Sequence, residues 1–141
     1  MPLGFQVTFD AAEPQQLADF WALALDFQPQ PPPPGFDSWE AFGESLGMAD
    51  QVSDFGAVVD PDSGRRLLFR RVPEGKTAKN RVHLDVNVSA DMPEGADRRA
   101  VVTDHVRRLL DAGATFLREV DEPTGYCQVL QDPEGNEFCV Q

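Results

Sequence analysis

The order of the expected elements occurs twice along this chain, and this internal repeat constrains the fold more than any other sequence feature. A strand, a helix and further strands that end in a hairpin come first, and the same order then follows again. Phe9-Asp10-Ala11 matches Leu84-Asp85-Val86, and the turn at 59–64 matches the turn at 131–135 with one residue inserted. A repeated unit of about 70 residues predicts a pseudo-twofold domain in which each half packs a helix on one sheet face.

We expect the two halves to form one α+β domain over residues 1–141. They would be tandem βαβββ modules at about 1–75 and about 80–141, with a mixed β-sheet curved into a cup and the helices outside. The expected elements are a strand at 5–10, a helix from 14, strands at 55–60 and 66–72, a strand at 82–88, a helix at 97–112 and a hairpin at 126–131 and 136–141.

Apolar side chains recur at helical spacing in both expected helices. In the first helix the stripe includes Leu17, Phe20 and Trp21, which we assign to the core. In the second helix Val102, Val106, Leu109 and Leu110 are expected to face inward, and His105 is expected to be a surface residue at the edge of the stripe.

A proline-rich segment separates the first helix from the later strands of its module. Four consecutive prolines at 31–34 impose an extended, stiff backbone. The segment 36–48 then carries a short apolar face, and we expect it to form a flap over one end of the cup. Phe36 and Trp39 are therefore candidate contacts for an aromatic or apolar ligand.

The net charge of −12 argues against nucleic acid and against anionic membrane surfaces as partners. No apolar run approaches the roughly 20 residues of a membrane span, and no secretory signal is visible, so a cytoplasmic protein is expected. Residues 1–64 contain no Lys or Arg, whereas seven of the 12 basic residues lie between Arg65 and Arg81. We expect this basic segment to pair with the acidic first half or with a second subunit; the alternative is contact with an anionic ligand.

The chain has two cysteines, Cys127 and Cys139. Two cysteines in a chain with no visible secretory signal do not suggest a fold stabilised by disulfides. If the last two strands pair around the turn at 132–135, Leu130 faces Glu137 and Gln128 faces Cys139. Cys127 then points to the opposite side of the sheet, because side chains alternate along a strand. A bridge between the thiols would need a different register.

Strict alternation in the strand at 82–88 places its valines and leucine on one face and His83, Asp85 and Asn87 on the other. Three segments of the chain resemble the glyoxalase-like branch of the vicinal oxygen chelate superfamily, which includes glyoxalases, bleomycin resistance proteins and dioxygenases. They are the stretches at 7–21, at 76–86 (Lys-Thr-Ala-Lys-Asn-Arg-Val-His-Leu-Asp-Val) and at 132–140 (Asp-Pro-Glu-Gly-Asn-Glu-Phe-Cys-Val). The resemblance implies paired modules, homodimers and, in the enzymes of the family, a divalent metal such as Zn, Ni, Mn or Fe in the cup.

The resemblance also implies which strands supply metal ligands, namely the first and last strand of each module. His83 and Glu137 stand there in the second module, and both side chains suit a divalent ion. In the first module the counterpart of His83 is Thr8 or, with the helix as anchor, Gln6. Arg66 is the counterpart of Glu137 and cannot ligate a cation, so the ligand set is incomplete. Arg66 could instead pair with Glu137.

Three functions remain open on this basis. The first is metal-free binding of a small molecule in the cup. Gln6, Thr8, Phe36, Trp39, Arg66, His83, Asp85, Tyr126 and Gln128 are the candidate contacts. The second is a metal-dependent lyase, isomerase or dioxygenase with His83 and Glu137 as ligands. The third is an interaction domain that docks an acidic partner. Glyoxalase I activity is not expected, because half of its ligand set is missing.

Overall fold

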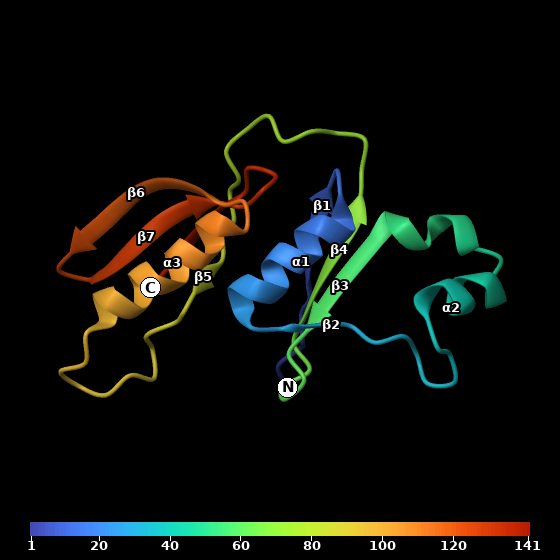
Figure 1. Cartoon of the computed structure of the whole chain (residues 1–141), viewed down its shortest axis with the longest axis horizontal. Helices are drawn as coiled ribbons and strands as arrows, with labels where there is room; N and C mark the ends of the chain where they lie inside the picture. Colours follow the sequence, from blue (N-terminus) through green and yellow to red (C-terminus); the bar gives the residue numbers. More distant parts are fainter. The chain divides into compact units, whose positions relative to one another are not determined.

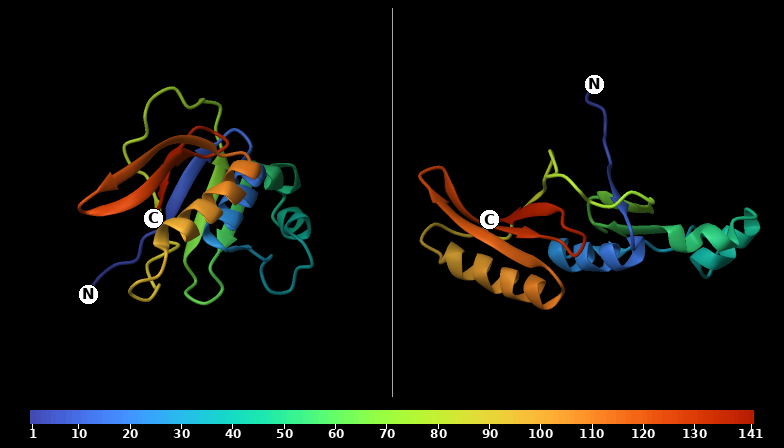
Figure 2. Two further views of the ribbon diagram at one scale, coloured as in Figure 1. Left: turned by 60° about the vertical axis from the view of Figure 1, so that its left-hand side comes forward. Right: turned by 90° about the horizontal axis from the view of Figure 1, so that it is seen from above.

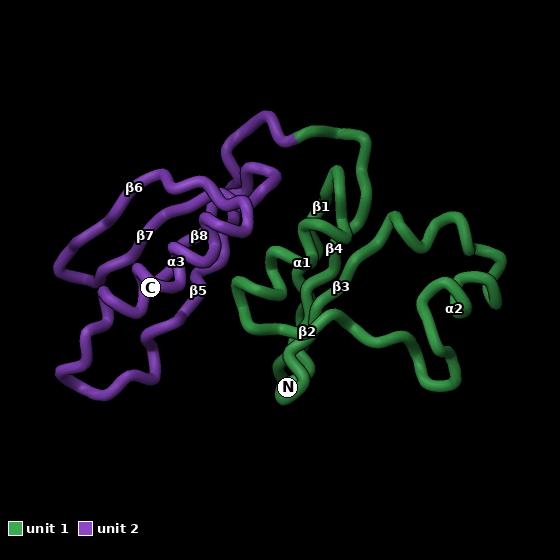
Figure 3. Tube along the Cα trace, viewed as in Figure 1, with its two compact units in different colours: residues 1–75 green, residues 76–141 purple.

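The computed structural model describes all residues 1–141, and they form two compact units, residues 1–75 and 76–141 (Figure 3). Each unit contains one four-stranded sheet. Each sheet has its own helix, hairpin and core.

The first unit consists of β1 (Val7–Ala11), α1 (Pro14–Leu25), β2 (Gln28–Pro29), α2 (Trp39–Ser45), the 3-10 helix η1 (Ala49–Asp54), β3 (Phe55–Val59) and β4 (Arg66–Arg71). Its strands lie in the order β1-β4-β3-β2 (Figure 1). The β1–β4 pair is parallel, and the other two pairs are antiparallel.

The second unit repeats this connectivity with β5 (Asp85–Val86), α3 (Arg98–Asp111), β6 (Thr115–Glu122), β7 (Gly125–Gln131) and β8 (Glu137–Val140). Its strand order is β5-β8-β7-β6, again with one parallel pair, β5–β8, and two antiparallel pairs. The predicted α+β class with two tandem βαβββ modules is confirmed.

An aromatic cluster forms the core of the first unit, where α1 packs on β3 and β4 (Figure 2). Trp21 is 1% exposed and meets Phe9 edge-on, with ring centroids 5.3 Å apart. Phe9 also contacts Phe69 of β4 at 5.1 Å. Pro14 at the first helical position suits the start of α1, and Asp26 in the left-handed region ends it.

In the second unit α3 packs on β7 and β8 through Val102, Val106 and Leu109, which are all buried. His105 is only 6% exposed, so the prediction of a surface histidine is wrong. It lies three residues after Val102 and four before Leu109, which places it within the apolar stripe rather than at its edge. Leu110, expected inward, is 39% exposed. No helix of the chain combines the length and hydrophobicity of a membrane span.

The strand predicted at 82–88 is shorter in the structure, where β5 pairs with β8 only at Asp85 and Val86. Val82 is 81% exposed. The partner strand β8 begins at Glu137, whose backbone N–H donates to the Asn80 side chain at 3.0 Å. Because that N–H is occupied, the ladder cannot extend in this direction.

Candidate functional site

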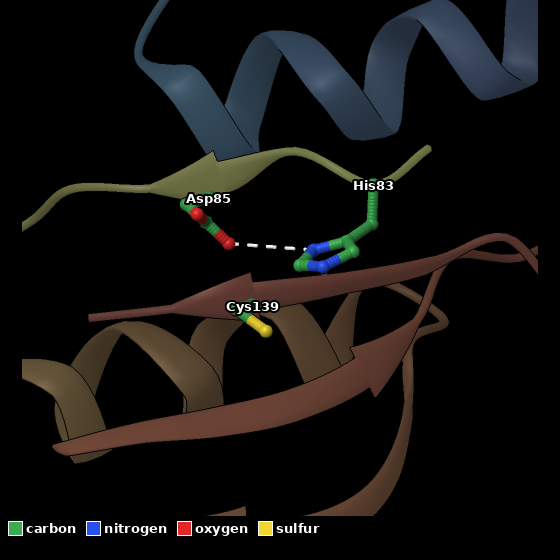
Figure 4. Close-up of side chains that lie close together, drawn as sticks. All are labelled: His83, Asp85 and Cys139. Carbon is green, nitrogen blue, oxygen red and sulfur yellow. Dashed lines mark ion pairs between the residues drawn. The ribbon is translucent and has the colours of Figure 1, made fainter. Parts of the chain in front are cut away.

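Three donor side chains gather on the polar face of the second sheet, the face turned away from α3. They are His83, Asp85 and Cys139, here called the donor cluster (Figure 4). One ligand atom from each lies within 4.8 Å of the others. His83 Nδ1 is 3.3 Å from Asp85 Oδ1, and both side chains are 48% exposed. Cys139, in contrast, is only 9% exposed.

The β5–β8 register positions the donor cluster. Asp85 is directly opposite Cys139 in the parallel ladder, so both side chains project from the same face. Their neighbours Val86 and Val140 form the next pair and are buried on the other face. The strand alternation therefore predicted the shared face of His83 and Asp85 correctly.

Glu137 is not part of the donor cluster, although it shares the polar face by alternation. Its carboxylate pairs with Lys79, with Nζ 2.7 Å from Oε2. This hydrogen bond lowers the pKa of Glu137, partly opposed by desolvation. Asn80 fixes the same connector by donating to the carbonyl oxygens of Val82 and Glu137. The structure thus brings His83 together with Asp85 and Cys139; Glu137 as a metal ligand stays a prediction.

The register of the last hairpin differs by one residue from the prediction, which was wrong. Leu130 is opposite Phe138, and Val129 is opposite Cys139. Cys127 lies two residues before Val129, so it points to the same face as Cys139. Cys127 is thus the diagonal neighbour of Cys139 on this face, and Asp85 is directly opposite Cys139. The sequence prediction thus missed Cys127 as a neighbour of the cluster, because a one-residue slip reverses every side chain.

Burial raises the pKa of the Cys139 thiol to about 12, and Cys127 and Asp85 add to this effect. We expect Cys139 in the folded, metal-free protein to resist iodoacetamide at pH 8, because an increase of about three pKa units lowers the thiolate fraction about a thousandfold. Mass spectrometry of the alkylated protein measures this, with Cys127→Ser as a single-cysteine control and urea as the unfolded reference. Equal alkylation rates with and without urea would contradict the expectation.

Tyr126 and Gln128 lie on the face of β7 that α3 covers, opposite to the donor cluster. Gln128 is opposite Val140, and its Nε2 donates to Thr103 Oγ1 of α3 at 3.2 Å and to the Tyr126 hydroxyl at 3.0 Å. Tyr126 lines a separate hollow of about 290 Å³ near the start of α3, and Arg99 stacks over its ring. Their predicted contact with a ligand beside His83 does not fit this placement.

The first unit has no matching donor cluster. Val59 is opposite Arg66 as Gln131 is opposite Glu137, so Arg66 is the structural counterpart of Glu137, as predicted. The β1–β4 ladder pairs Thr8 with Leu68, so Thr8 corresponds to Asp85 and Leu68 to Cys139. The register thereby favours Gln6, not Thr8, as the counterpart of His83. Arg66 Nε is buried without a hydrogen-bond partner.

The predicted flap contains α2, capped by the Ser38 side chain. Phe36 and Trp39 both pack edge-on against Phe42, with centroids 5.1 and 5.9 Å away. The Trp39 indole donates to the Gln30 carbonyl oxygen at 2.9 Å. These aromatics thus form a small cluster of their own, and ligand contact by Phe36 and Trp39 stays a prediction.

The basic segment is partly used in ion pairs, as predicted. Arg65 pairs with Asp60, and Arg71 pairs with Glu13 and Asp54, all within the acidic first half. Two of its guanidinium groups are therefore already neutralised within the first unit.

Comparison with known proteins identifies the family. The sequence model of the glyoxalase-like domain matches residues 6–141. The chain belongs to the glyoxalase-like domain family. No curated protein matches the sequence.

Solved structures of similar fold include a glyoxalase/bleomycin resistance protein/dioxygenase family enzyme from Burkholderia phytofirmans PsJN, at 17% identity and TM-score 0.64, covering 96% of this chain and 94% of that one. Another is a variant of the fosfomycin resistance protein FosX from Listeria monocytogenes, complexed with Mn(II) and 1S,2S-dihydroxypropylphosphonic acid. It has 10% sequence identity and a TM-score of 0.64, and the match covers 100% of this chain and 90% of that one. The bleomycin-binding protein of Streptomyces verticillus, complexed with copper(II)-bleomycin, has 18% sequence identity and a TM-score of 0.55. The match covers 100% of this chain and 96% of that one. The predicted vicinal oxygen chelate superfamily is confirmed.

Proposed function

We propose that this glyoxalase-like protein binds a small molecule through a divalent metal ion held by the donor cluster. The observation that carries the proposal is the approach of His83, Asp85 and Cys139, which supply nitrogen, oxygen and sulfur donors within 4.8 Å. Three protein ligands leave one position of a tetrahedral ion for a bound molecule. Such an ion would act as a Lewis acid toward the oxygen atoms of that molecule.

The donor set fits this role. Ligands of a tetrahedral zinc ion lie about 3.4–3.8 Å from one another, so small side-chain rotations would bring the three donor atoms into range. The half-exposed His83 and Asp85 leave one side of the cluster open to a ligand, whereas the buried Cys139 closes the other. Asp85 Oδ1 lies 3.3 Å from His83 Nδ1, so the carboxylate orients the imidazole toward the cluster.

Metal-free binding is the second candidate, because two observations favour it. The pKa of Cys139, raised to about 12, makes the loss of its proton to a metal costly. The first unit, moreover, adds no imidazole, carboxylate or thiol at the corresponding positions. In this case the His83–Asp85 pair would itself hydrogen-bond the ligand.

Elemental analysis and calorimetric titration with Zn, Ni, Mn and Fe(II) test the first candidate. We expect wild type to bind about one ion per chain and His83→Ala to lose at least about tenfold in affinity, since one of three ligands is removed. Asp104→Ala changes an exposed carboxylate on the outer side of α3 and is the matched control. Absence of binding in wild type would leave only the metal-free candidate.

The proposed binding of a small molecule is tested by ligand-observed NMR. The compounds are copper(II)-bleomycin, metal-free bleomycin and a library of small aromatic and phosphonic acids. We expect binding that His83→Ala weakens and Asp104→Ala does not. If the same compounds bind both variants equally, the donor cluster is not the binding site. A reaction, a homodimeric state and a cytoplasmic location remain predictions, of which the dimer is checked by light scattering.

A further inference from the structure

Because the hairpin register differs by one residue from the predicted one, Cys127 lies on the same face as Cys139, which the strand pattern alone did not indicate. Val129 is opposite Cys139, so Cys127 on the same strand is the diagonal neighbour of Cys139 on the polar face. This placement brings the two thiols within reach of each other on one face of the sheet. Cys127 is partly exposed and Cys139 is buried, and both are free.

The diagonal geometry argues against a disulfide. Diagonal residues in antiparallel strands have Cα atoms about 7–8 Å apart, whereas disulfides usually need less than about 6.8 Å. A hydrogen bond between the sulfur atoms tolerates this spacing, since it requires no bond at about 2 Å. The pair is thus better suited to a shared proton than to oxidation.

We propose that Cys127 is a positioning residue that donates its S–H to the Cys139 sulfur, so that Cys139 ligates a thiophilic ion such as zinc rather than manganese. The inference rests on the metal-dependent form of the proposed function. Coordination replaces the Cys139 proton, which leaves to solvent, and turns that sulfur into a hydrogen-bond acceptor. Cys127 retains its own proton and becomes the donor.

The choice of metal follows from the sulfur ligand. Thiolates favour zinc and other soft or borderline ions, whereas manganese prefers carboxylate, carbonyl and water oxygens. A hydrogen bond from a neighbouring group orients a metal ligand, and its removal typically weakens metal affinity about 10–100-fold. Cys127 would therefore influence affinity without touching the ion.

Cobalt(II) is the spectroscopic probe, because a thiolate ligand gives it a sulfur-to-metal charge-transfer band in the near ultraviolet. We expect this band in wild type and in Cys127→Ala at saturation, and its loss in Cys139→Ser. Cys127→Ala should bind Co(II) and Zn(II) about 10–100-fold more weakly. Cys127→Ser should recover part of that loss, since its hydroxyl can donate. Mn(II), followed by electron paramagnetic resonance, should bind wild type more weakly than Zn(II) does.

The outcomes separate the two proposals. If Co(II) binds without the band, or if Mn(II) binds more tightly than Zn(II), the inference is overturned while metal binding stands. If the band halves in Cys127→Ala at saturation, Cys127 is a direct ligand and its positioning role is wrong. If neither Co(II) nor Zn(II) binds wild type, the metal-dependent function fails as well. Circular dichroism of every variant verifies that it is folded.

Discussion

Replacing Trp21 by alanine is expected to lower the free energy of unfolding by about 3–5 kcal/mol, the usual cost of deleting a large buried aromatic side chain. Trp21 is 1% exposed and packs edge-on against Phe9 and Phe20, with centroids 5.3 and 5.9 Å away. The loss combines the transfer free energy of the indole with the cavity that the rigid sheet beneath α1 cannot close. Urea unfolding followed by circular dichroism measures it, since the substitution changes fluorescence.

Leu23 of the same helix is the matched control, because it is 40% exposed. Leu23→Ala should cost less than about 1 kcal/mol, since it removes little buried surface and alanine favours helix. Similar losses for the two variants would mean that helix propensity, rather than the aromatic core, governs this region.

Asp132→Ala is expected to cost about 3 kcal/mol, because it removes a buried acceptor that serves several hydrogen bonds. Asp132 is 2% exposed. Its Oδ1 accepts from the backbone N–H groups of Glu134 and Asn136 at 2.9 and 3.0 Å, and Oδ2 accepts from Asn136 Nδ2 at 2.9 Å. Alanine would leave these donors without a partner in the turn that joins β7 to β8.

Asp132→Asn separates the hydrogen bonds from the charge. Its remaining side-chain oxygen can still accept from both backbone N–H groups, so we expect it to be clearly less destabilising than alanine in thermal and urea unfolding. Equal destabilisation by the two substitutions would show that the charge and the hydrogen bond from Asn136 Nδ2 to Oδ2, rather than the two backbone N–H bonds to Oδ1, hold the turn. Because this turn sets the start of β8, Asp132→Ala should also weaken any metal binding at Cys139.

The internal repeat and the strand and helix periodicities predicted the fold class, the two βαβββ modules and the shared face of His83 and Asp85. These features are encoded locally, because the direction of a side chain follows from its position along one strand or helix. Arg66 as the counterpart of Glu137 was likewise predictable, since the two hairpin turns match in sequence.

The composition of the donor cluster depended on pairing between strands. A hairpin register one residue away from the expected one moved Gln128 to the face beneath α3 and brought Cys127 beside Cys139. Lys79, which is distant from Glu137 in the sequence, forms an ion pair with it. The sequence by itself determined which residues of each strand share a face. Only the tertiary structure decided which residues of neighbouring strands lie on the same face of the sheet, because the register between strands is fixed by side-chain packing and the turn together.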